Sequence, residues 1–268
     1  MRYRTLFVAW YLWFLVFSLR VAISPVLPLL EDELSLTHAQ AGRLFTFLHT
    51  GYILILLAAG LIVSRWGSRR TLLFIFAAMA LLSLAIRFSG GAGELSVLLF
   101  LLGLATGLLL PAVVPVLTAT YSRAAWGRTF GVFDTAVGIA LFGMPFLAMA
   151  VLTFGTWREM FLILSALCWL AVSLVFLVIK RDVGVSGSGR RADYRSLLRN
   201  RDLLVIGFLF IFMTTASQGI YAIVPIYMVK GRGIDIQLTN TVFGLSRLPA
   251  ILGALGGGYM LDRLGPRR

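Results

Sequence analysis

The sequence contains little charge for its length. Of 268 residues only 13% are charged, and the chain has 24 Lys and Arg residues but only 11 Asp and Glu residues. Soluble globular domains are ~25% charged, so this composition excludes an ordinary water-soluble enzyme. The hydrophobic share of 59% also excludes a disordered chain. The basic excess is typical of membrane proteins, whose cytoplasmic loops collect Lys and Arg. With no soluble surface to present these charges, we expect no nucleic-acid partner.

Several chemical signatures are missing as well. The single cysteine, Cys168, lies in an apolar run and forms no intrachain disulfide, so we expect an inert core thiol. No cluster of His and Cys residues suggests a metal site, and no glycine-rich loop suggests a bound nucleotide. We therefore expect no cofactor, no metal and no enzymatic activity.

Long apolar segments are abundant instead. A membrane-spanning helix needs ~20 predominantly apolar residues. Eight segments meet this requirement: 6–30, 41–63, 71–89, 96–121, 129–153, 159–179, 203–229 and 239–261. The sequence therefore predicts an all-α polytopic membrane protein with eight transmembrane helices and the lipid bilayer as its surroundings.

The basic residues predict the orientation of these segments. If the N-terminus is inside, most of the Lys and Arg residues fall on the inner side, so both ends should be cytoplasmic. We expect a plasma-membrane protein, in the inner membrane if the source is a bacterium. The predicted units are a six-helix bundle at 1–183, a basic cytoplasmic linker at 184–201 and a partial second bundle at 202–268. The linker is interpreted as a tether, with a regulatory segment as the alternative.

An internal repeat relates the two predicted units. Residues 60–70 and 258–268 match at five positions with an offset of 198 residues. The matched positions are Gly60, Arg65, Gly67, Arg69 and Arg70 in the first copy, and Gly258, Arg263, Gly265, Arg267 and Arg268 in the second. The second copy has Asp262 where the first has Ser64. Such a repeat indicates a transporter built from two related halves.

The repeated pattern resembles the loop signature of the major facilitator superfamily. The segment Gly103-Leu-Ala-Thr-Gly107 is similar to helix four of that family, and 156–161 is similar to its entry into helix six. The resemblance covers the whole chain and implies an MFS-type bundle, with eight of the family's twelve helices present. It also implies a C-terminally truncated chain. We therefore expect residues 1–268 alone to be unable to transport.

Four ionisable residues lie within the predicted membrane segments: Arg20, His49, Asp134 and Arg247. Such groups usually face a bundle interior or a water-filled cavity. The offset of 198 residues pairs His49 with Arg247, and Arg20 with Gln218. Arg20 lies ~15 Å from the outer membrane surface, too deep for its side chain to reach water easily. We predict that Arg20, His49, Gln218 and Arg247 line one central cavity, with Tyr221 as a further lining residue.

The two buried arginines suggest the substrate class. A desolvated guanidinium binds carboxylate-like or phosphate-like groups through two parallel hydrogen bonds. The segment around Arg20 resembles that of facilitators that carry organic phosphates or carboxylates. The leading hypothesis is a secondary transporter that takes up a small organic or inorganic anion by alternating access. A proton is the expected symported ion, carried by His49 or Asp134.

Other interpretations stay open at this point. Asp134 either controls an inner gate or pairs with Arg128. His49 is equally well explained by a hydrogen bond within its own helix. Arg247 is alternatively explained by a hydrogen bond to a backbone carbonyl. The competing functions are proton-driven multidrug export and a non-functional truncated product.

Smaller features concern the architecture. Thr37 and Gln40 have the spacing of a helix-capping box, and Glu31, Asp32 and Glu33 are expected in a solvated outer loop. Seven prolines lie in or beside apolar segments, where the carbonyls that they release must find donors within the protein. They are Pro25, Pro28, Pro111, Pro115, Pro145, Pro225 and Pro249.

Overall fold

The computed structural model describes residues 2–179, 200–249, 252–253, 256 and 259. In these residues the ordered elements are all helices, which confirms the predicted all-α class. The first unit contains α1 (Arg2–Val21), η1 (Ser24–Val26), α2 (Leu27–Glu33), α3 (His38–Trp66), α4 (Ser68–Arg87), α5 (Ala92–Gly107), α6 (Leu109–Thr120), η2 (Arg123–Ala125), α7 (Trp126–Leu152) and α8 (Trp157–Val178). The second contains α10 (Arg201–Ile226), the π-helical η3 (Tyr227–Gly231) and α11 (Ile236–Leu245).

The first unit contains six helical stretches long and apolar enough to cross a membrane, and they correspond to the first six predicted segments. Two of the predicted helices are not continuous α-helices. The predicted helix 6–30 is divided into α1, η1 and α2, and the predicted helix 96–121 into α5 and α6. Much of the predicted linker and the whole second loop motif apart from Tyr259 lie outside the described residues.

The interruption of the first stretch follows from its prolines. A proline has no N–H to donate and its ring clashes with the preceding turn of an α-helix. Pro25 and Pro28 follow the end of α1 at Val21, and the chain forms the short 3₁₀-helix η1 before α2 begins. Arg20 therefore lies in the last turn of α1, directly before the interruption.

Glycines allow α3 and α5 to pack backbone against backbone. A Cβ atom on Gly103 would lie 2.0 Å from the carbonyl oxygen of Leu48, and one on Gly51 would lie 2.1 Å from that of Phe100. A Cβ atom on Gly107 would lie 2.3 Å from the Ile55 side chain and 2.9 Å from the carbonyl oxygen of Tyr52. Small residues spaced in this way are a common helix-packing device in membranes. The contact brings the backbone of Tyr52 in α3 against α5.

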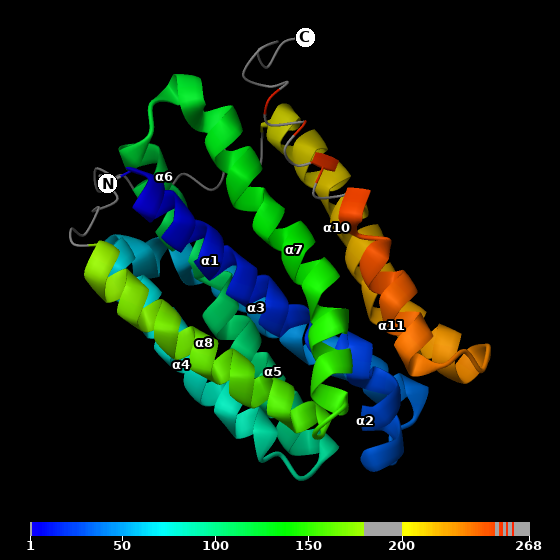
Figure 1. Cartoon of the computed structure of the whole chain (residues 1–268). Coiled ribbons are helices and arrows are strands. Elements are labelled where there is room, and N and C mark those ends of the chain that lie inside the picture. Colours follow the sequence, from blue (N-terminus) through cyan, green and yellow to red (C-terminus); the bar gives the residue numbers. More distant parts are fainter. Residues whose placement is uncertain (1, 180–199, 250–251, 254–255, 257–258, 260–268) are drawn as a thin grey trace.

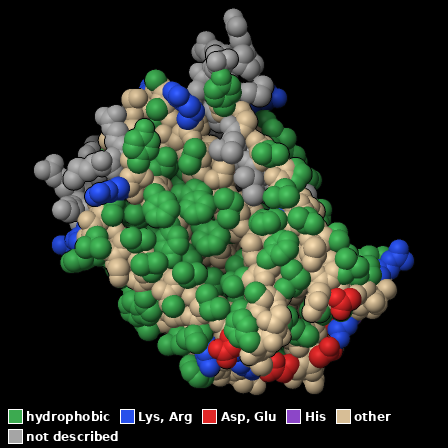
Figure 2. Space-filling view, in the orientation of Figure 1, with side chains coloured by type: hydrophobic (Ala, Val, Ile, Leu, Met, Phe, Trp, Pro, Cys, Tyr) green, Lys and Arg blue, Asp and Glu red, His purple; other side chains and the backbone are tan. Residues whose placement is uncertain are grey.

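The two units lie side by side in Figure 1, with α7 of the first unit next to α11 of the second. Within the first unit, α1 packs against α7 and α8, while α4 packs against α8. Figure 2 shows hydrophobic side chains across the middle of the molecule and charged side chains gathered toward its edges. This distribution fits helices that cross a bilayer.

We call one edge of the bundle the α2 end. It contains α2, the α4–α5 turn, the start of α8 and the α10–α11 turn. The structure corrects one expectation here, because Glu31, Asp32 and Glu33 do not form a solvated loop. All three belong to α2 or its last turn, and Glu31 is buried. The capping box of Thr37 and Gln40 at the start of α3 is confirmed.

Each of the three carboxylates contacts a different element. Glu31 accepts hydrogen bonds from His38 Nδ1 at the start of α3. Glu33 accepts from the side chains of Trp157 and Arg158 at the start of α8. Asp32 forms an ion pair with Lys230 in η3 of the second unit. These partners explain why a run of acidic residues is folded back onto the protein.

Candidate substrate site

Arg20 is a buried cation with aromatic neighbours. Only 9% of its surface is exposed. Its guanidinium carbon lies 4.1 Å from the centre of the Tyr52 ring and 5.3 Å from that of Phe17. Among the described residues, no carboxylate oxygen lies within 4.0 Å of a guanidinium nitrogen of Arg20, so Arg20 forms no ion pair with them. Cation–π contacts are worth roughly 0.5–2 kcal/mol, much less than the cost of burying a charge. An anionic ligand would therefore find a strong partner in Arg20.

His49 lies on the same face of α3 as Tyr52, since residues three apart on a helix are neighbours. Its side chain is half-buried, and its Nδ1 donates a hydrogen bond to the carbonyl oxygen of Phe45 at 2.8 Å. The carbonyl can only accept, so Nδ1 carries the proton and Nε2 is the remaining acceptor. The hydrogen bond expected within the helix is present, and the same face of α3 carries Tyr52, which contacts Arg20.

Arg247 follows the end of α11 in the second unit. Its guanidinium carbon lies 5.1 Å from the centre of the Tyr221 ring and 5.0 Å from that of Phe243. Its Nε is buried and has no hydrogen-bond partner among the residues that the structure describes. An unpaired buried donor costs roughly 1–3 kcal/mol, so this nitrogen is also available to a ligand.

Tyr221 contacts Arg247 through its ring and η1 through its backbone. It is buried, and its hydroxyl donates to the carbonyl oxygen of Leu141 in α7 at 3.2 Å. Its own carbonyl oxygen accepts a hydrogen bond from Ser24, which lies four residues beyond Arg20. Tyr221 thus contacts Arg247 within the second unit and η1, the element that follows α1, in the first. Gln218 lies in α10 three residues before Tyr221, and its side chain is outside the described part of the chain.

Asp134 lies on α7 with an exposed side chain. Its Oδ1 accepts a hydrogen bond from the Trp13 indole at 3.4 Å, and the neighbouring Thr135 accepts one from Trp10 at 2.9 Å. Among the described residues Asp134 forms no ion pair with Arg128. The structure therefore brings Asp134 together with the aromatic face of α1 rather than with the basic loop.

The first loop motif lies at the junction of α3 and α4. Gly67 ends α3 with a φ of 80°, a conformation that favours glycine. Arg69 donates to the carbonyl oxygen of Phe176 in α8 at 3.3 Å and lies over the ring of the same residue. Arg65 lies in the last turn of α3, five residues after Gly60, and Arg70 lies in the first turn of α4. The second motif, with Asp262, lies outside the described residues.

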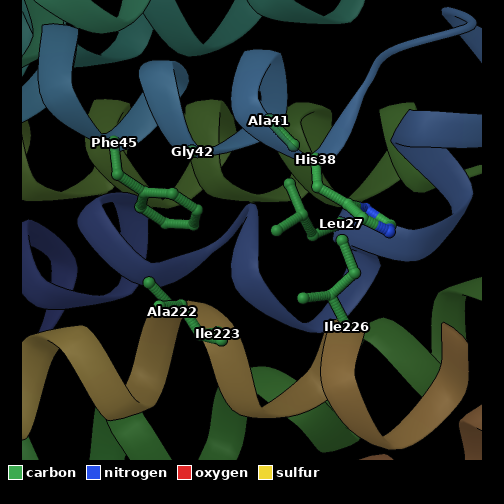
Figure 3. Close-up of a pocket in the computed structure, with 8 residues that line it drawn as sticks. All are labelled: Leu27, His38, Ala41, Gly42, Phe45, Ala222, Ile223 and Ile226. Carbon is green, nitrogen blue, oxygen red and sulfur yellow. The ribbon is translucent and has the colours of Figure 1, made fainter. Parts of the chain in front are cut away.

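An apolar cavity of about 310 Å³ opens between α3 and α10 at the α2 end. Figure 3 shows Ala41, Gly42 and Phe45 of α3 facing Ala222 and Ile223 of α10, with His38 at the edge. This lining offers few polar groups. Among the described residues that line it there is no arginine.

Sequence reasoning missed two contributors to the site. Tyr52 and Ser24 are uncharged, so neither stands out in an apolar segment. The spacing of Tyr52 from His49 was an available signal, because it places both on one face of α3. For Ser24 no signal was available, since its partner lies 197 residues away.

The structure has six apolar stretches long enough to span a membrane and a second helical unit. It also has a buried arginine, Arg20, with no carboxylate partner in the described part of the chain. These features define a polytopic helical membrane protein. The profile of the Major Facilitator Superfamily matches residues 9–268. The chain belongs to this family.

Curated relatives are similar over most of this chain. The hexuronate transporter of Bacillus subtilis (strain 168) is 22% identical over 256 residues, covering 91% of this chain and 60% of the relative. A probable sulfoacetate transporter of Cupriavidus necator is 23% identical, covering 94% of this chain and 63% of the relative. The chain thus spans about three fifths of the length of these relatives.

Solved structures show the same fold. A bacterial homologue of the human lysosomal transporter Spinster, in an inward-facing and unoccupied conformation, superposes with a TM-score of 0.75 at 15% identity. That match covers 100% of this chain and 64% of the other. The nucleoside transporter NupG superposes with a TM-score of 0.76 at 12% identity, covering 97% of this chain and 69% of the other. These likenesses confirm the MFS-type bundle.

Proposed function

We propose that the protein is a secondary transporter that moves a small organic or inorganic anion across the membrane by alternating access. The observation that carries the proposal is Arg20, a buried cation without a carboxylate partner in the described residues. A buried charge of this kind requires a counter-ion, and a guanidinium binds carboxylates through paired hydrogen bonds. Hexuronate and sulfoacetate are named for the two relatives above, and galactarate or glucarate for a probable transporter of Bacillus subtilis that is 24% identical to this chain. All of these compounds are organic anions.

Within this proposal the substrate site is formed by Arg20 and His49 from the first unit and by Arg247 and Gln218 from the second. Tyr52 holds the Arg20 guanidinium against its ring. A proton is the proposed symported ion, and His49 or Asp134 carries it. Arg128 and the two loop motifs are proposed to act at the cytoplasmic end during the conformational change.

Ligand-dependent stabilisation tests the substrate class. The purified protein is heated with hexuronate, glucarate or sulfoacetate, and separately with the lipophilic cation tetraphenylphosphonium. At 100 times its dissociation constant, a specific anion should stabilise the protein by about 2.7 kcal/mol and raise the melting temperature. Stabilisation by tetraphenylphosphonium and by none of the anions would instead support multidrug export.

The proposed orientation places both ends in the cytoplasm and the α2 end outside, in the plasma membrane or a bacterial inner membrane. Ser122→Cys and Gly93→Cys introduce thiols at opposite ends of the bundle, at exposed positions. The native Cys168 is buried and should remain unlabelled. In intact cells a membrane-impermeant maleimide should label position 93 but label position 122 only after permeabilisation. The reverse pattern would show the opposite topology.

A further inference from the structure

Two prolines release carbonyl groups where the two units meet. Pro145 lies inside α7 and Pro225 inside α10. Neither has an N–H to donate to the carbonyl four residues earlier, so the oxygens of Leu141 and Tyr221 lack their normal helical donors. In a membrane such groups must find a partner within the protein or in water.

Both released carbonyls accept a hydroxyl from the opposite unit. The Tyr221 hydroxyl of α10 donates to Leu141 at 3.2 Å, and the Ser24 hydroxyl of η1 donates to the carbonyl oxygen of Tyr221. Ser24 is completely buried and Tyr221 is 2% exposed. The two hydrogen bonds therefore form a continuous buried chain from η1 through Tyr221 to α7.

Further contacts between the units lie toward the same end. Asn240 of α11 donates to the carbonyl oxygen of Pro25 at 3.3 Å, and Gly244 packs against Phe146 of α7. Asp32 and Lys230 form an ion pair at the edge, where the Asp32 side chain is 67% exposed. In the described residues the units are thus joined toward the α2 end.

We propose that the hydroxyls of Ser24 and Tyr221 form a latch that stabilises the closed state of the α2 end. The proposal rests on the alternating access of the proposed function. When the units close, water is removed from the carbonyls of Leu141 and Tyr221, and these two hydroxyls replace it as donors. A closed state without a hydroxyl leaves a buried acceptor unpaired. The Asp32–Lys230 pair contributes less, because exposed ion pairs are screened by water and salt.

The distance across the α2 end tests the latch. Ala39→Cys in α3 and Gln237→Cys in α11 supply exposed positions for spin labels, in a Cys168→Ala background. Pulsed electron paramagnetic resonance of the protein in nanodiscs then measures the ratio of open to closed states. Ser24→Ala and Tyr221→Phe should each raise this ratio about tenfold. Asp32→Asn should raise it only about twofold.

Matched controls separate the latch from a general loss of hydrogen bonds. Ser83 donates to the carbonyl oxygen of Phe161, and Tyr11 to that of Leu167, both inside the first unit. Ser83→Ala and Tyr11→Phe should leave the ratio unchanged. Equal shifts in these controls, or distance distributions for Ser24→Ala and Tyr221→Phe that match the parent, would overturn the proposal.

Pro225→Ala supplies a second and more specific test. Alanine restores an N–H that can donate to the Tyr221 carbonyl, so the Ser24 hydroxyl becomes dispensable. Ser24→Ala should then shift the ratio less than about twofold in the Pro225→Ala background. An undiminished tenfold shift would contradict the latch. Because this readout needs no substrate, failure of the latch and failure of anion transport are distinguished.

Discussion

Replacing Arg20 by glutamine is expected to weaken anion binding by at least about thirtyfold. Removing one partner of a buried hydrogen-bonded charge pair costs about 2–5 kcal/mol, and each 1.4 kcal/mol is a factor of ten in affinity. Arg20→Lys keeps the charge but loses the planar fork that binds a carboxylate through two hydrogen bonds, so a loss of about tenfold is expected. Equilibrium binding of the anion identified by the stabilisation screen measures both values.

Removing the charge of Arg20 should weaken anion binding but stabilise the ligand-free protein. Arg20 is buried without a carboxylate partner in the described residues, and its contact with Tyr52 recovers only roughly 0.5–2 kcal/mol of the desolvation cost. Arg20→Met, which fills a similar volume without charge, should therefore raise the melting temperature of the ligand-free protein. The expected rise is roughly 2–4 °C for each kcal/mol recovered.

Arg43→Gln is the matched control for Arg20. Arg43 also lies on a membrane-spanning stretch, but it is exposed near the start of α3. Its substitution should change neither anion affinity nor the melting temperature. If Arg20→Gln bound the anion as well as the parent, or Arg20→Met melted several degrees lower, Arg20 would have a structural role rather than a binding one.

Gly103→Ala is expected to destabilise the protein by about 3 kcal/mol or more. The added Cβ atom would lie 2.0 Å from the carbonyl oxygen of Leu48 and 2.9 Å from the backbone nitrogen of Tyr52. Backbone atoms cannot rotate away, so α3 and α5 must separate by more than about 1 Å. Overpacking with some freedom to adjust already costs about 1–3 kcal/mol. Gly103→Leu should prevent accumulation of the folded protein altogether.

Thermal unfolding in detergent, followed by tryptophan fluorescence, measures this effect. Gly143→Ala is the control, because a Cβ atom there meets nothing within 4 Å in the middle of α7. It should be neutral or stabilise by about 0.5–1 kcal/mol, since alanine favours a helix over glycine. Equal melting temperatures for Gly103→Ala and Gly143→Ala would show that the α3–α5 contact is adjustable. Because the contact also positions Tyr52, we expect Gly103→Ala to weaken anion binding as well.

The sequence by itself determined the class of the protein and identified Arg20 as a cation within an apolar segment. Apolar runs of more than about 20 residues can only be buried in a bilayer or a large core, and this property depends on local composition alone. The repeat at an offset of 198 residues likewise predicted two related units, and Arg20 was visible as a charge in an apolar run. The family profile confirms the family assignment, and the structure confirms the helical class.

Only the tertiary structure decided how these elements meet. The sequence predicted a solvated loop for the acidic residues 31–33, yet each carboxylate contacts a partner on a different helix. Tyr52 lies beneath Arg20 because three glycines bring α3 against α5. Ser24 and Tyr221 satisfy carbonyls that prolines release, across 197 and 80 residues of sequence. Such pairs depend on how the helices pack in three dimensions. The sequence around an uncharged side chain in an apolar segment does not indicate which distant residue it will contact.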